Sequence, residues 1–165
     1  MHPIPRSLVV LVSVVVAALL VAACAGPMTS PVATITPSQA ATSPLVTVET
    51  RGGECPNGPC GSLIDIGSDG SVHQVRPADQ DLGTIPKAEL DALTAEIERA
   101  NFPLIESRPF TGECPTAFDG QETIYTFHLQ TGDEAIATCK VAIDPNHPLF
   151  LAVGAAMRAF MTEGS

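Results

Sequence analysis

Hydrophobic and polar positions change along the chain in three successive patterns. Residues 8–21 are apolar apart from one serine, and the next stretch mixes proline, serine and threonine with small apolar residues and carries no charge. From about residue 47 onward, apolar side chains recur with the spacings of strands and helices. The pattern predicts an N-terminal segment over 1–23, a disordered linker over 24–46 and one folded domain over 47–165.

The first strand pair is predicted around an Asp-Gly turn. Residues 63–66 and 71–75 are rich in β-prone side chains, and Gly67-Ser68-Asp69-Gly70 lies between them. Asp-Gly between two such runs is a strong hairpin signal, with the glycine in the left-handed conformation. The expected cross-strand pairs are Ile66 with Val72 and Ile64 with Gln74.

A helix is predicted after the first hairpin, over residues 87–100. Apolar side chains recur there at helical spacing, and a proline lies at the start of the helix. The side chains that form this stripe are Leu90, Leu93 and Ile97.

A second unit repeats the order of hairpin and helix. We expect a strand over 122–130, a tight turn at Gly132-Asp133 and a return strand over 135–143. The last helix, over 149–161, is apolar at nearly every position. Such a helix is expected to be buried on several sides, or otherwise to form an exposed patch for a partner.

The predicted fold class is therefore α+β. Two hairpins form an antiparallel sheet, two helices pack on one of its faces, and the order is β-β-α-β-β-α. Residues 46–51 are expected to add an N-terminal strand at the edge of the sheet.

The N-terminal segment is typical of a secretory signal peptide. Arg6 precedes the apolar run, and small residues follow it. The run of residues 8–21 is short for a membrane span, which needs about 20 apolar residues.

The end of this segment resembles the lipobox of bacterial lipoproteins. Val21-Ala22-Ala23-Cys24 places a branched residue and two small ones before the cysteine. The resemblance implies a signal peptide cut before Cys24 and fatty acyl chains, such as palmitate, on that residue. The partner of the acylated cysteine is then membrane lipid, on the extracytoplasmic side of the cell membrane or outer membrane. Two or three acyl chains give firm anchoring, whereas one does not.

Charge narrows the choice of other partners. The chain has 8 Lys and Arg against 18 Asp and Glu, a formal net charge of −10, with no Trp and one Tyr. We therefore expect no nucleic-acid partner.

Four cysteines remain in the body: Cys55, Cys60, Cys114 and Cys139. An even number after an export signal favours disulfides over a zinc site, because the paired Cys-x2-Cys spacing of zinc ligands is missing. The preferred pairing is Cys55–Cys60 with Cys114–Cys139, since each bridge closes within one unit. Pairing across the units stays open at this point.

The sequence points to no catalytic residues, cofactor or metal. The three histidines of the body form no metal-binding doublet. One loop is a candidate binding site, because it carries two aromatic rings, acids and a disulfide cysteine, and loops carry much of protein function. The alternative is that both of its rings plug the edge of the core. The candidate residues of this loop are Phe110, Glu113, Phe118 and Asp119.

These observations favour a lipid-anchored, non-catalytic binding module whose protein or small-molecule partner is unknown. Two alternatives remain. A small enzyme could use Asp119 and Glu122 with His128, which requires a deep cleft that joins them. A protease inhibitor could present a stapled loop, at 55–60 or at 110–120.

Overall fold

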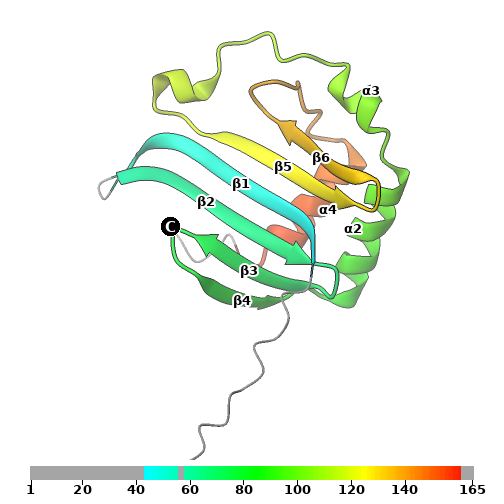
Figure 1. Cartoon of the computed structure of the whole chain (residues 1–165). Helices are drawn as coiled ribbons and strands as arrows, with labels where there is room; N and C mark the ends of the chain where they lie inside the picture. Colours follow the sequence, from blue (N-terminus) through cyan, green and yellow to red (C-terminus); the bar gives the residue numbers. More distant parts are fainter. Residues whose placement is uncertain (1–42, 56–57, 161–165) are drawn as a thin grey trace, which may run out of the picture. The chain divides into compact units, whose positions relative to one another are not determined.

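The computed structural model describes residues 43–55 and 58–160. The predicted signal peptide, Cys24 and most of the predicted linker lie outside these residues. The order of elements is as follows (Figure 1): β1 (Pro44–Cys55), β2 (Gly58–Gly67), β3 (Ser71–Arg76), β4 (Gln80–Thr84), α2 (Lys87–Arg99), α3 (Phe102–Glu106), the 3₁₀ turn η1 (Pro115–Phe118), β5 (Glu122–Leu129), β6 (Gly132–Ala137) and α4 (Pro148–Met157).

The six strands form one antiparallel sheet in the order β4-β3-β2-β1-β5-β6. The prediction of an α+β fold with an antiparallel sheet is confirmed. The N-terminal strand is also present, but its expected place at the sheet edge is wrong, because β1 lies between β2 and β5. Val46 and Val48 on this strand are buried in the core, because helix residues pack on the face of the sheet that carries them.

The first hairpin has the predicted register. Ile66 pairs with Val72, and Ile64 pairs with Gln74. Gly70 has a φ of 85°, and its N–H donates to the carbonyl oxygen of Gly67 at 2.9 Å. The local Asp-Gly signal therefore fixes both the turn and the strand pairing.

Two elements of the first half were not predicted. Strand β4 has the sequence QDLGT, in which only the leucine is apolar, so no alternation marks it as a strand. Helix α3 has only five residues and follows α2 after a short break. The predicted order β-β-α-β-β-α is therefore wrong in detail, because four strands precede α2.

The second hairpin differs from its prediction. Leu129 pairs with Gly132, so the turn lies at Gln130-Thr131, and the predicted turn at Gly132-Asp133 is wrong. This register places Ile136 opposite Tyr125 and buries it. The return strand ends at Ala137, well before residue 143, because the chain then turns back with the N–H groups of residues 140 and 141 on the carbonyl of Ala137.

Helices α2 and α4 share one core with a single face of the sheet (Figure 1). The predicted stripe of α2 is confirmed, with Leu93 and Ile97 buried and Leu90 partly buried against the core. The apolar helix α4 is shorter than predicted and is not covered all round. Leu151 is 54% exposed, because the sheet and α2 cover only part of the helix circumference.

Candidate functional site

Two disulfides lie in the body, and both have the predicted pairing. Cys55–Cys60 joins the end of β1 to the start of β2, with the Cα atoms 5.2 Å apart. Cys114–Cys139 joins the loop before η1 to the turn after β6, with the Cα atoms 5.1 Å apart. The expected place of Cys139 on the return strand is wrong, because β6 ends two residues earlier.

A bulge in β1 brings the two disulfides to the same end of the domain. The register between β1 and β2 shifts between Arg51 and Glu54, so that Gly52 and Gly53 bulge from the ladder. A Cβ atom on Gly52 would lie 2.6 Å from Cγ2 of Thr116 on η1. A Cβ atom on Gly53 would lie 3.1 Å from the carbonyl oxygen of residue 119 and 3.5 Å from Cβ of Cys60. Only glycine allows η1 to approach β1 so closely.

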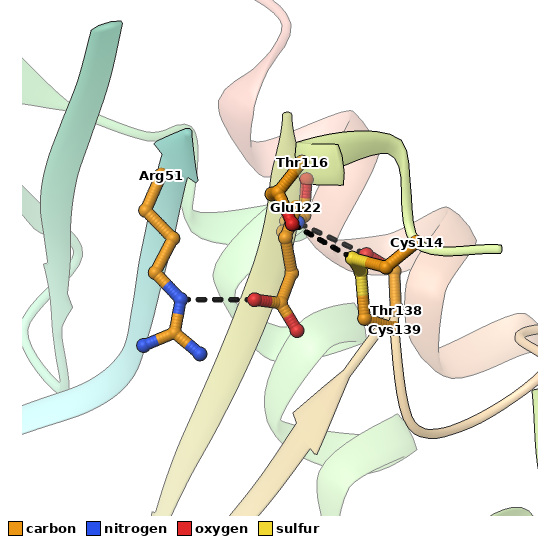
Figure 2. Close-up of a disulfide and its surroundings, with 7 residues drawn as sticks. Arg51, Cys114, Thr116, Glu122, Thr138 and Cys139 are labelled. Atoms are coloured by element: carbon orange, nitrogen blue, oxygen red, sulfur yellow. Dashed lines mark hydrogen bonds and ion pairs between the residues drawn. A yellow bond between two sulfur atoms is a disulfide. The ribbon is translucent and has the colours of Figure 1, made fainter. Parts of the chain in front are cut away.

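We call this region the stapled end: the two disulfides, η1 and the glycine bulge. Figure 2 shows an ion pair between Arg51 and Glu122 beside the second disulfide. Glu122 is only 6% exposed, and its Oε2 accepts from Nε of Arg51 at 2.9 Å. Thr123 N–H donates to Oγ1 of Thr138 at 3.0 Å, which ties β5 to the turn that carries Cys139.

The structure presents part of the predicted binding loop at the stapled end. Phe118, the last residue of η1, is 68% exposed. Asp119 caps the turn with a φ of 58° and is exposed, as is Glu113. The alternative in which Phe118 plugs the core edge is therefore wrong, since η1 approaches β1 through Thr116 and leaves the ring of Phe118 in solvent.

Phe110 belongs to a different part of the loop. Its backbone N–H donates to the carbonyl of Lys140 at 2.9 Å, and its half-buried ring covers Gly112. Together with a bridge between Pro109 and Val141, these contacts fix the start of the loop. Three of the predicted site residues, Glu113, Phe118 and Asp119, are therefore exposed on or beside η1, whereas Phe110 is held near residues 140–142.

A polar chain on the other face of the sheet was missed by sequence reasoning. Oγ1 of Thr47 donates to Oδ1 of Asp65 at 2.6 Å and lies 2.9 Å from Nε2 of His128. Nδ1 of the same ring lies 2.9 Å from Oδ1 of Asp133. The alternation Val-Thr-Val in β1 marked Thr47 as facing away from the core, but no sequence signal connected it to β2, β5 and β6.

This chain of polar groups superficially matches a nucleophile, base and orienting acid. The proton count argues against that role. The single hydroxyl proton of Thr47 goes to the carboxylate of Asp65, so this proton is not donated to Nε2 of His128. The polar chain therefore links strands β2, β1, β5 and β6 by hydrogen bonds.

The residues of the enzyme alternative are not brought together. Glu122 is buried against Arg51, while His128 contacts Thr47 and Asp133. Glu122 and His128 lie six residues apart on β5, which corresponds to about 20 Å along a strand. Asp119 is exposed on the cap of η1. The three side chains therefore do not converge on the deep cleft that this alternative requires.

Neither the remaining structural features nor the comparisons with known proteins assign a function to this site. Among residues 43–55 and 58–160, no three His, Cys, Asp or Glu side chains are placed to hold a metal ion. None of the helices in that same part of the chain has the length and apolar character needed to cross a membrane. No protein-family model and no curated protein matches the sequence.

Proposed function

We propose that this protein is a lipoprotein, anchored through acylated Cys24 on the extracytoplasmic side of a membrane, whose body is a non-catalytic binding module. The main observation that supports the lipid anchor is the pairing of the cysteines. Four of the five cysteines are joined in two disulfides, which is typical of exported proteins. The fifth is Cys24, which follows the apolar segment at the position of a lipobox cysteine.

The stapled end supports the binding role. Phe118 presents an aromatic ring on a turn that is fixed by Cys114–Cys139 and by the contact between η1 and β1. An exposed aromatic ring on a rigid support binds a partner without a large cost in ordering the loop. The helical conformation of η1 disfavours the protease-inhibitor alternative at the loop 110–120, because proteases bind an extended segment in their active sites. The same alternative at the loop 55–60 stays a prediction.

The anchor is tested by expressing the chain and its Cys24→Ser variant in bacteria and separating membranes from soluble material. We expect the original chain in the membrane fraction, with a mature mass that begins at Cys24 and includes fatty acyl groups. The variant should lack the lipid mass. A chain that keeps residues 1–23 and carries no lipid would overturn this part of the proposal.

The binding role is tested with a photo-crosslinking residue at Ala117, next to Phe118, in the cell envelope. We expect a discrete adduct that disappears when Phe118→Ser is added. The matched control places the same crosslinker at Ala92, an exposed position of α2. Adducts that are equal at both positions and insensitive to Phe118→Ser would exclude the stapled end as the binding surface.

A further inference from the structure

A cavity of about 120 Å³ lies between α3 and the start of α4, away from the stapled end. Half of its lining residues are apolar and half are polar. Ala142 N–H donates to the carbonyl of Arg108 at 2.8 Å, which fixes two of the wall segments relative to each other. The lining residues are Asn101, Leu104, Ile105, Arg108, Ala142, Asp144, His147 and Phe150.

Three polar side chains keep hydrogen-bond donors for a ligand. Asn101 uses its Oδ1 to cap α3, accepting from Leu104 N–H at 3.1 Å, so its amide N–H groups remain. Nδ1 of His147 accepts from Leu149 N–H at 3.3 Å, which puts the proton of the neutral ring on Nε2. The guanidinium of Arg108 contributes further donors. These donors match a carboxylate.

One acceptor faces the donors. Nη1 of Arg108 and Oδ2 of Asp144 form a partly exposed ion pair at 3.8 Å, which is too long for a hydrogen bond. Oδ1 of Asp144 already accepts from Asn146 N–H at 2.9 Å, so Oδ2 is the oxygen left for a ligand. A plain anion would be repelled by Asp144, and a plain cation would be repelled by Arg108. A zwitterion satisfies both charges.

The apolar half of the cavity determines which side chain the ligand can carry. Ile105 and Phe150 are buried, and Leu104 is 64% exposed at the mouth. An apolar cavity of roughly 150 Å³ holds a benzene molecule, so 120 Å³ accommodates a short aliphatic side chain. We infer that this cavity binds a small aliphatic α-amino acid, with its carboxylate on Arg108 and its ammonium group on Asp144.

The test is a titration of the full chain in detergent micelles with L-valine, followed by amide proton–nitrogen NMR spectra and calorimetry. Isovalerate, which lacks the ammonium group, and isobutylamine, which lacks the carboxylate, are the comparison ligands. The variants are Arg108→Gln and Asp144→Asn, with Arg99→Gln as the matched control. Arg99 is exposed on α2 and pairs with Glu96 at 2.9 Å, outside the cavity.

We expect saturable shifts from L-valine that are confined to residues 101–108 and 142–150, and weaker binding of both comparison ligands. Because charge-assisted hydrogen bonds are the strong ones, each variant should weaken L-valine binding by about tenfold, while Arg99→Gln leaves it unchanged. Asp144→Asn should strengthen the binding of isovalerate, because the variant removes the repulsion between Asp144 and the carboxylate of this ligand.

The absence of saturable shifts with L-valine would overturn the inference. Equal affinities for L-valine and isovalerate, or tighter L-valine binding by Asp144→Asn, would also overturn it, because the site would then take plain carboxylates. The result is independent of the membrane anchor and of Phe118, so its failure and the failure of the proposed function are distinguishable.

Discussion

Glu122 illustrates how much the burial of one charge depends on its partner. Its carboxylate lies beside Arg51, whose side chain is half exposed, so the pair is desolvated mainly on the acid side. Removing the arginine leaves a buried carboxylate without a counter-charge, whereas removing both charges does not. The coupling between the two side chains therefore contributes more to the stability of the fold than either residue does alone.

We expect Arg51→Met to lower the free energy of unfolding by about 1–3 kcal/mol, and the double variant Arg51→Met/Glu122→Met to recover most of the loss. Urea denaturation of the full double-mutant cycle measures the coupling energy. The control is the exposed pair Lys87–Asp91, which has a similar distance of 2.7 Å but a coupling expected at about 0.3–0.5 kcal/mol. Equal coupling energies in the two pairs would show that burial of Glu122 contributes nothing.

Tyr125 gives a second prediction at the residue scale. Burial raises the pKa of its phenol above the ordinary value of 10.0. The folded state therefore holds the phenolic proton more tightly than the unfolded chain does. This contribution to stability is fully present below the unfolded pKa of about 10 and is lost as the pH rises through the folded pKa.

The chain has one tyrosine and no tryptophan, so tyrosinate absorbance reports Tyr125 alone. We expect its midpoint to lie above that of the urea-unfolded chain. The loss of stability above pH 10 should be smaller in Tyr125→Phe, which has no phenol to ionise. Identical midpoints in the folded and unfolded chains would contradict the burial effect.

At the scale of elements, two glycines have opposite roles. A Cβ atom added to Gly154 in α4 would have no atom within 4 Å, whereas Gly52 has a φ of 91° and faces Thr116 and Gly120. Gly154→Ala should raise the free energy of unfolding by about 0.5–1 kcal/mol, because alanine is the better helix former. Gly52→Ala should lower it by about 1–3 kcal/mol, because it combines backbone strain with a clash against η1.

Thermal or urea unfolding of the two variants checks this contrast. Limited proteolysis gives a second readout, since loss of the contact between η1 and β1 should expose residues 115–121 to cleavage in Gly52→Ala alone. A Gly52→Ala variant as stable and as resistant as the original chain would show that η1 does not depend on the bulge.

At the scale of the whole molecule, the two disulfides differ in the length of chain that they constrain. Cys114–Cys139 spans 25 residues and Cys55–Cys60 spans 5. The loop-closure relation gives about 3.5 kcal/mol for the longer loop and about 2 kcal/mol for the shorter one. Cys114→Ser/Cys139→Ser should therefore shift the urea midpoint more than Cys55→Ser/Cys60→Ser. The reverse order would mean that the short bridge acts through the folded state.

Local signals predicted the parts of the fold that depend on neighbouring residues. The Asp-Gly turn determined the register of β2 and β3, and the stripe of leucines and isoleucine determined the buried face of α2. Strand β4 and the turn at Gln130-Thr131 carried no such signal. The last helix was recognised from its apolar composition, but that composition could not show which side stays exposed.

The candidate sites also divide into those that local sequence signals predicted and those that they did not. Cysteine spacing led to the correct disulfide pairs, and the composition of the loop pointed to Phe118. The polar chain through Thr47 and His128 and the cavity beside Arg108 could not be found, because each joins segments that are distant in the sequence.

The sequence by itself determined the local structure of this protein: where the first hairpin turns, which helix face is apolar, and which cysteines can close short loops. The tertiary structure alone decided that β1 lies at the centre of the sheet, that η1 packs on a glycine bulge, and that Arg108 and Asp144 face one cavity. The physical reason is the range of the interactions. Turns and helices depend on residues a few positions apart, whereas strand order and cavities depend on the packing of the whole core.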